Sequence, residues 1–381
     1  MSMIAPERSQ EFHNAAHVER RARKIDDPVQ RLKYLRAAAA ITEAPKQRTW
    51  AVPAMAFSIV VLVLTMRSDA HLRAKPEIRR VTPTIRMAAP EVPNVWRVEA
   101  GKDFEVYSNG LRIDNQLAVS SRPRSYQLVP VEEGGKRLAG ALVTTPAGIV
   151  FHTTESHQVP FEAPEQRNLQ RITRETLLFV RNKQAYHFVI DRFGRVHRIV
   201  AESDAANHAG NSIWADAKSL YLELNQSFLG IAFEASMQAD QAPINEAQIH
   251  SGKVLTEMLR SKYRIPAENC VTHAQVSVNP GNMRIGWHAD WGKDFPFQQM
   301  GLPENYELPL PSLFLLGFDY DPVYINATGT GIWKALALAE ERTRDAAGAK
   351  GIALADYQAR LRRRYRDEIT TLRYRSSDEE N

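Results

Sequence analysis

The chain has 381 residues, of which 44% are hydrophobic and 24% are charged, and these shares are typical of chains that fold around a sizeable core. The formal charge of +5 is small for this length, so no nucleic-acid partner is predicted, although a weakly basic surface would suit an anionic polymer or a membrane. Cys270 is the single cysteine, which excludes an internal disulfide and a cysteine-cluster zinc finger.

An uncharged apolar run, AVPAMAFSIVVLVLTM, occupies residues 51–66. A helix of this length would span about 24 Å, slightly less than a hydrocarbon core. We interpret it as a transmembrane signal anchor, with a buried core helix or a signal-peptide core as alternatives. Residues 1–50 would then be a cytoplasmic polar tail, and residues 67–95, which contain four prolines, a linker. Lys and Arg number five in 31–50 and six in 67–86, so charge does not decide the orientation.

Alternating apolar residues around a Ser-Asn-Gly turn predict a small β-rich lead-in over residues 96–139. Residues 140–300 then interleave strand and helix patterns. The expected strands and hairpin arms are GIVFHTT, YHFVID, VHRIV, LGIAFEA and ENCVTH, and the expected helices are EQRNLQRITRETLLFVRN and NEAQIHSGKVLTEMLRSKY. The predicted fold class is α/β (α+β), with a mixed central sheet flanked by helices between the membrane anchor and a C-terminal helical extension.

Residues 301–381 are predicted to form a proline-rich connection followed by helices near 331–346 and 352–373. The second helix carries an apolar stripe at three- and four-residue steps on an Arg-rich background, formed by Leu354, Tyr357, Leu361, Tyr365, Ile369 and Leu372. Such a stripe packs against its own domain or against a sister helix, or it binds a protein partner.

Two histidines, His152 and His273, each follow a short apolar strand pattern. Histidines at the same end of neighbouring strands can converge on one point, and a catalytic zinc needs three protein ligands and an open position. The third ligand would come from the loop that contains His288 and Asp290. Both residue types bind zinc, so chemistry alone does not choose between them.

Five motifs in order resemble one known family: HTT after a strand, AYHFVIDRFGRVHRIV, NHAGNS, NQSFLGIAFE, and a distal His followed by DWGKDFPF. Over about residues 145–300 the sequence is similar to the zinc-dependent N-acetylmuramoyl-L-alanine amidases, whose fold is shared with peptidoglycan recognition proteins and a phage lysozyme. The resemblance leaves both ends of the chain unexplained.

The resemblance implies a Zn²⁺ cofactor bound by His152, His273 and Asp290. Asp290 matches the third ligand, but it lies 17 residues after His273, a longer separation than the family pattern, so His288 stays open as the alternative. Where the family often has a Lys, this chain has His288, which we expect to act on the oxyanion or on the leaving amine.

The remaining site residues are also implied by the resemblance. Tyr186 matches a tyrosine that assists the zinc-bound water, and it would have to carry that role because Ala232 stands where another branch uses a Glu. We expect three further residues to contact the substrate: His208, Asn211 and Thr153.

The implied function is hydrolysis of the amide between N-acetylmuramic acid and the L-alanine of the stem peptide, by a zinc-activated water. The partner would be peptidoglycan or muropeptides. The alternative is a non-catalytic, membrane-anchored peptidoglycan-binding protein. Because the wall lies outside the cytoplasm, we expect a single-pass protein of the inner membrane, with residues 67 onward in the periplasm or at the cell wall.

Overall fold

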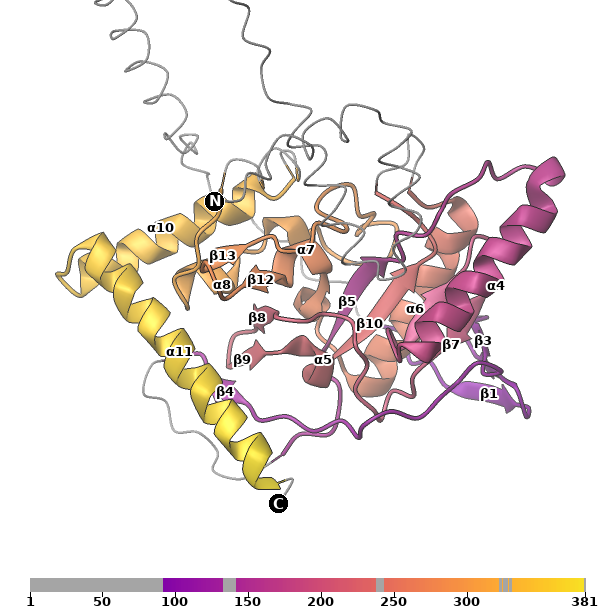
Figure 1. Cartoon of the computed structure of the whole chain (residues 1–381), viewed down its shortest axis with the longest axis horizontal. Coiled ribbons are helices and arrows are strands. Elements are labelled where there is room, and N and C mark those ends of the chain that lie inside the picture. Colours follow the sequence, from indigo (N-terminus) through magenta and orange to yellow (C-terminus); the bar gives the residue numbers. More distant parts are fainter. Residues whose placement is uncertain are drawn as a thin grey trace, which may run out of the picture. The chain divides into compact units, whose positions relative to one another are not determined.

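A mixed eight-stranded sheet lies at the centre of the described chain (Figure 1). The computed structural model describes residues 92–132, 142–237, 243–321, 324, 328 and 331–379. The strands run in the order β1-β2-β3-β7-β6-β10-β5-β11. Their bounds are β1 Arg97–Ala100, β2 Phe104–Tyr107, β3 Arg112–Asp114, β5 Gly148–Thr153, β6 Phe188–Ile190, β7 Val196–Arg198, β10 Phe228–Phe233 and β11 Cys270–Thr272. The predicted mixed sheet is confirmed.

The strands at the β11 end of the sheet are parallel, whereas those at the β1 end are mostly antiparallel. β10 pairs in parallel with both β5 and β6, and β11 pairs in parallel with β5. β6 and β7 form the expected antiparallel hairpin, and β1 to β3 extend the same sheet through a parallel β3–β7 pair. The residues before 140 therefore complete the central sheet.

Two smaller sheets and a set of helices surround this sheet. The small sheets are β4-β9-β8, from Val129–Pro130, Ser219–Leu222 and Ile213–Ala215, and β12-β13, from Val278–Asn279 and Arg284–Ile285. The helices are η2 Ala163–Glu165, α4 Gln166–Asn182, α5 Leu224–Ser227, α6 Glu246–Tyr263, η3 Ala267–Asn269, α7 His273–Val276, η4 Asn305–Glu307, α8 Pro311–Phe314, α10 Trp333–Ala349 and α11 Leu354–Glu379.

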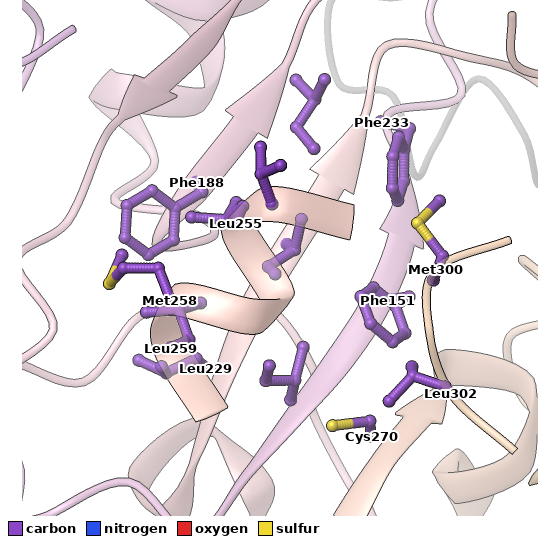
Figure 2. Close-up of a cluster of buried hydrophobic side chains, with 14 of the residues drawn as sticks. Phe151, Phe188, Leu229, Phe233, Leu255, Met258, Leu259, Cys270, Met300 and Leu302 are labelled. Atoms are coloured by element: carbon purple, nitrogen blue, oxygen red, sulfur yellow. The ribbon is translucent and has the colours of Figure 1, made fainter. Parts of the chain in front are cut away.

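The two faces of the sheet are covered by different helices, and the pleat decides which side chains meet which helix. Ile149 and Phe151 of β5 point into the core that α6 covers, together with Leu229 and Phe233 of β10 (Figure 2). The alternate residues, including His152, therefore point to the other face. On that face Ala232 and Val189 pack against Leu177 and Val180 of α4.

Helices α4 and α6 form where the sequence provides helix signals. α6 begins with a capping box, because the Asn245 side chain accepts from the backbone N–H of Gln248 and the Gln248 side chain accepts from the N–H of Asn245. It ends at Arg264, which is in the left-handed conformation. In α4 the buried residues recur at three- and four-residue steps: Leu169, Ile172, Thr173, Leu177 and Val180.

The apolar stripe of α11 is covered by the chain itself. Tyr357 and Leu361 pack with Ala347 of α10, and the ring of Tyr365 lies 4.9 Å from that of Phe318. The prediction that this stripe packs against its own domain or against a sister helix is therefore confirmed: its central residues are buried within the chain, and Leu354 alone among its members is exposed. Binding of a protein partner by the C-terminal helices stays a prediction.

The predicted anchor, residues 51–66, lies outside the described residues, as do the tail before it and the linker from 67 to 91. Among the residues that the structure describes, no helix combines the length and the apolar character needed to cross a bilayer.

Candidate metal centre

The register of the central strands brings the two histidines together. Thr272 of β11 pairs with Phe151 of β5, so the residues that directly follow them along the chain, His273 and His152, lie at the same end of the sheet. Their ring centroids are 4.5 Å apart. His152 is 1% exposed and His273 4%, so both imidazoles are removed from bulk water.

His273 is held by a helix start. It is the first residue of α7, and Thr272 and Gln275 form a capping box in which the Gln275 side chain accepts from the backbone N–H of Thr272. This change from strand to helix fixes the direction in which the imidazole leaves the backbone.

Asp290 bridges the two histidines. Its Oδ1 lies 2.8 Å from Nδ1 of His273, and its Oδ2 lies 3.2 Å from Nδ1 of His152. Burial alone would raise the pKa of Asp290, but the neighbouring imidazole of His273 lowers it overall to well below its usual value. Asp290 is therefore an ionised carboxylate at neutral pH.

The motif after Asp290 anchors it in the core. The side chains of Trp291, Phe295 and Phe297 are almost fully buried, and the ring of Phe295 stacks on Phe151 at 4.4 Å. Trp291 has a positive φ of 54°, which turns the chain sharply after Asp290. The DWGKDFPF motif thus fixes the carboxylate by burying the aromatic residues that follow it.

His208 sets the protonation pattern of His152. Its Nε2 lies 3.3 Å from the carbonyl oxygen of Phe228, which can only accept, so this nitrogen carries the proton. Nδ1 of the neutral ring then accepts from Nε2–H of His152 at 3.1 Å. Nδ1 of His152 is left with its lone pair directed toward Asp290. Burial and the neighbouring His273 lower the pKa of His152 to about 4, which keeps that lone pair free at neutral pH.

His208 fits against the sheet because Gly230 has no side chain. A Cβ on Gly230 would lie 2.6 Å from Cγ of His208. His208 is buried behind His152, with both ring nitrogens bonded inside the protein. Its expected contact with substrate remains a prediction, whereas its contact with His152 was not expected from the sequence.

These donors fit a zinc ion. One ligand atom from each of His152, His273 and Asp290 lies within 4.8 Å of the other two. Two neutral imidazoles and a carboxylate form a donor set that zinc uses at catalytic sites, where a fourth position stays open. The hydrogen bond from His152 to His208 is the kind of outer partner that orients such a ligand.

His288 lies beside the three donors and not among them. Its ring stacks on His273, with centroids 4.6 Å apart and 19° between the planes. Its backbone N–H donates to Oγ of Ser277 at 3.0 Å. Trp287, the residue before it, is 61% exposed, so this side of the site is open to solvent.

Tyr186 lies on the other side of His152. The ring centroids of the two residues are 5.0 Å apart, and the Tyr186 hydroxyl is 3.5 Å from the carbonyl oxygen of Thr153. Burial raises the pKa of Tyr186, so the phenol stays protonated and can donate. The structure thus brings Tyr186, Thr153 and His208 close to His152.

Asn211 is placed less directly than the other expected substrate contacts. It is exposed in the loop before β8, where its backbone carbonyl accepts from the N–H of Val278. Its expected contact with substrate stays a prediction.

Comparison with known proteins assigns this domain to a class. Residues 143–292 match the model of the N-acetylmuramoyl-L-alanine amidase family, and this segment contains all three converging donors. The resemblance expected from the motifs is therefore confirmed over residues 143–292. A comparison with curated proteins found no match to this sequence.

Several solved structures are similar at low identity. AmpDh3 from Pseudomonas aeruginosa in complex with an anhydromuramic pentapeptide is 21% identical over 44% of this chain and 64% of its own, with a TM-score of 0.32. The chain thus spans slightly less than two thirds of that structure. AmiD from E. coli, in complex with its anhydro-N-acetylmuramic acid peptide substrate, is 20% identical over 57% of this chain and 97% of its own, with a TM-score of 0.36. A Drosophila peptidoglycan recognition protein, PGRP-SD, is 22% identical over 35% and 73%, with a TM-score of 0.26.

Proposed function

We propose that this protein is a zinc-dependent peptidoglycan amidase. It would cleave the amide between the lactyl group of N-acetylmuramic acid and the L-alanine of the stem peptide. The observation that carries the proposal is the convergence of His152, His273 and Asp290, two of them buried histidines, in a domain of the amidase family. When bound, zinc supplies Lewis acidity, which activates water for attack near neutral pH and polarises the scissile carbonyl.

The chain's own residues would prepare the remaining steps. The Tyr186 hydroxyl has only a long 3.5 Å contact to a carbonyl, so it can turn to donate to the oxyanion that forms during attack. His288, whose ring stacks on His273, is proposed to donate to the oxyanion or to protonate the leaving amine. Thr153, Asn211 and His208 are proposed to line the substrate cleft around them.

The direct experiment compares the full-length chain in detergent with His152→Ala, His273→Ala and Asp290→Ala. Zinc content is measured by elemental analysis, and peptide release is measured on purified muropeptides. We expect each variant to lose zinc and to lose at least about a hundredfold in rate, because removal of a single transition-state donor already has an effect of that size. His250→Ala, an exposed histidine on α6, is the matched control and should retain both.

The same assay separates the enzyme from the non-catalytic alternative. A binding protein would retain zinc and bind isolated peptidoglycan without releasing peptide. Retention of wild-type activity in His152→Ala and His273→Ala would end the enzymatic proposal.

We also propose that residues 51–66 hold the chain in the inner membrane, with the amidase domain in the periplasm. The proposal rests on the uncharged apolar run and on the location of the substrate. Proteolysis of spheroplasts tests it: residues 92–379 should be degraded from outside, and their protection would contradict this orientation.

A further inference from the structure

We propose that two tyrosines beyond the family-matched segment, Tyr306 and Tyr324, are positioning residues for the metal centre. They would fix the backbone around His273 and Asp290, which makes the C-terminal extension an integral part of the site. The inference rests on the proposed function, because it assumes that these donors hold zinc. The family match ends at residue 292, so both tyrosines lie outside it.

Tyr324 connects to both ligands through one residue, Ala274, which directly follows His273. The Tyr324 hydroxyl donates to the carbonyl oxygen of Ala274 at 2.9 Å. The N–H of Ala274 in turn donates to the backbone carbonyl of Asp290 at 3.2 Å. The buried Tyr324 hydroxyl therefore restrains Ala274, whose backbone hydrogen bond connects the residue after His273 to Asp290.

The ring of Tyr324 also shapes the loop that leads to Asp290. Gly286 has a φ of +78°, and a Cβ built there would lie 2.0 Å from Cδ2 of Tyr324, so the ring lies directly on the backbone of this glycine. Oγ1 of Thr328 donates to the carbonyl of Tyr324 at 3.0 Å. The Thr328 methyl group lies 2.9 Å from the position of a Cβ on Gly292. Contacts from this part of the extension thus lie on both sides of Asp290.

Tyr306 holds the residue that follows Asp290. Its hydroxyl donates to the carbonyl of Trp291 at 2.7 Å and accepts from the N–H of Phe295 at 3.2 Å. Trp291 is the residue with the positive φ, a conformation that persists only where surrounding contacts impose it. Tyr306 and Tyr324 are both about 5% exposed, so neither hydroxyl bond competes strongly with water.

The long separation between His273 and Asp290 explains why the tyrosine hydroxyl bonds would matter for metal binding. Asp290 lies 17 positions after His273, and a longer connection fixes its ends less closely unless other contacts restrain it. Loss of an outer partner of a metal ligand typically lowers metal affinity 10- to 100-fold. Because the tyrosines act through the backbone, we expect an effect near the lower end, about tenfold for each hydroxyl.

The test uses Tyr324→Phe and Tyr306→Phe in the full-length chain, since each removes a hydroxyl and keeps the ring. Zinc affinity is measured by competition with a chromophoric chelator, and coordination geometry by the d–d absorption of the Co²⁺-loaded protein. Tyr320→Phe is the matched control: Tyr320 is a buried tyrosine of the same extension, and its hydroxyl donates to Glu340 at 2.6 Å, away from the donors.

We expect Tyr324→Phe and Tyr306→Phe to weaken zinc binding about tenfold and to shift the Co²⁺ bands, while Tyr320→Phe does neither. The thermal midpoints of the three metal-free variants should be similar. Wild-type affinity and spectra in both test variants would overturn the inference, as would an equal loss in Tyr320→Phe. If the wild-type chain hydrolyses muropeptides and these variants bind zinc normally, the inference alone fails. If the wild-type chain binds no metal, both proposals fail.

Discussion

Nδ1 of His273 lies 2.8 Å from Oδ1 of Asp290, although the two residues lie 17 positions apart along the chain. The loop between them carries Trp287 and His288 on the solvent side, while the aromatic residues after Asp290 enter the core. The contact between His273 and Asp290 therefore lies between the buried donors and the open side of the site, where a substrate would enter. The predictions below test the groups on either side of it.

Tyr186→Phe should lower kcat on muropeptides by about a hundredfold or more, because the variant removes a hydroxyl donor and keeps the ring beside His152. Zinc affinity should stay within about twofold of wild type, since the hydroxyl is not among the converging donors. Steady-state kinetics together with chelator competition checks both halves. An unchanged kcat would remove Tyr186 from the mechanism.

His208→Leu should weaken zinc binding 10- to 100-fold, because Nε2–H of His152 loses its acceptor and the ring is free to turn. His208→Asn should recover part of that loss, since the Asn side-chain oxygen can accept near the position of Nδ1. Titration of the metal-free protein by calorimetry measures the difference. Equal affinities in the two variants would show that the acceptor is unimportant.

The metal-free protein should become less stable as the pH falls from about 6.5 toward 4. Burial lowers the pKa of His152 to about 4, and it lowers the pKa of His187 and of His208 well below the usual value. In this pH range the unfolded chain binds protons that the folded chain does not bind. The free energy of unfolding therefore decreases as the pH falls, by up to about 1.4 kcal/mol per pH unit for each histidine. Urea denaturation in EDTA at several pH values measures the slope. A flat profile over this range would contradict the neutral state of these rings.

Gly230→Ala should destabilise the protein by about 1–3 kcal/mol, because the new methyl group would overlap the His208 ring. It should also weaken zinc binding, since His208 can move only by releasing His152. Gly348→Ala is the comparison: this glycine lies in α10, where, apart from its chain neighbours and the backbone of its own helix, no described atom lies within 4 Å of the added carbon, and alanine favours a helix. Its stability should equal or exceed that of wild type in the same urea experiment.

Local sequence patterns predicted the parts of the fold that depend on short-range periodicity. The strand before His152, helices α4 and α6, and the strand before His273 all form close to where apolar spacing placed them. The two histidines were expected to converge because each follows a strand pattern, and histidines at the same end of neighbouring strands can meet. This prediction requires only that the two strands are neighbours, and β5 and β11 are indeed paired.

Other features depend on contacts between distant segments that have no motif. The bond from His208 to His152 depends on Gly230 of another strand leaving room for the ring. The hydroxyl bonds of Tyr306 and Tyr324 reach backbone carbonyls, which every residue carries, so no residue type at the receiving position indicates them. The stripe of α11 could be seen in the sequence, but the α10 surface that covers it could not.

The order in which the chain is synthesised gives the two tyrosine contacts a further meaning. The ribosome synthesises His152, His273 and Asp290 before Tyr306 and Tyr324. The nascent chain therefore contains all three donors before the two tyrosine hydroxyl bonds that restrain their backbone can form. The proposed tight binding of an ion would then require the chain to be complete through residue 324.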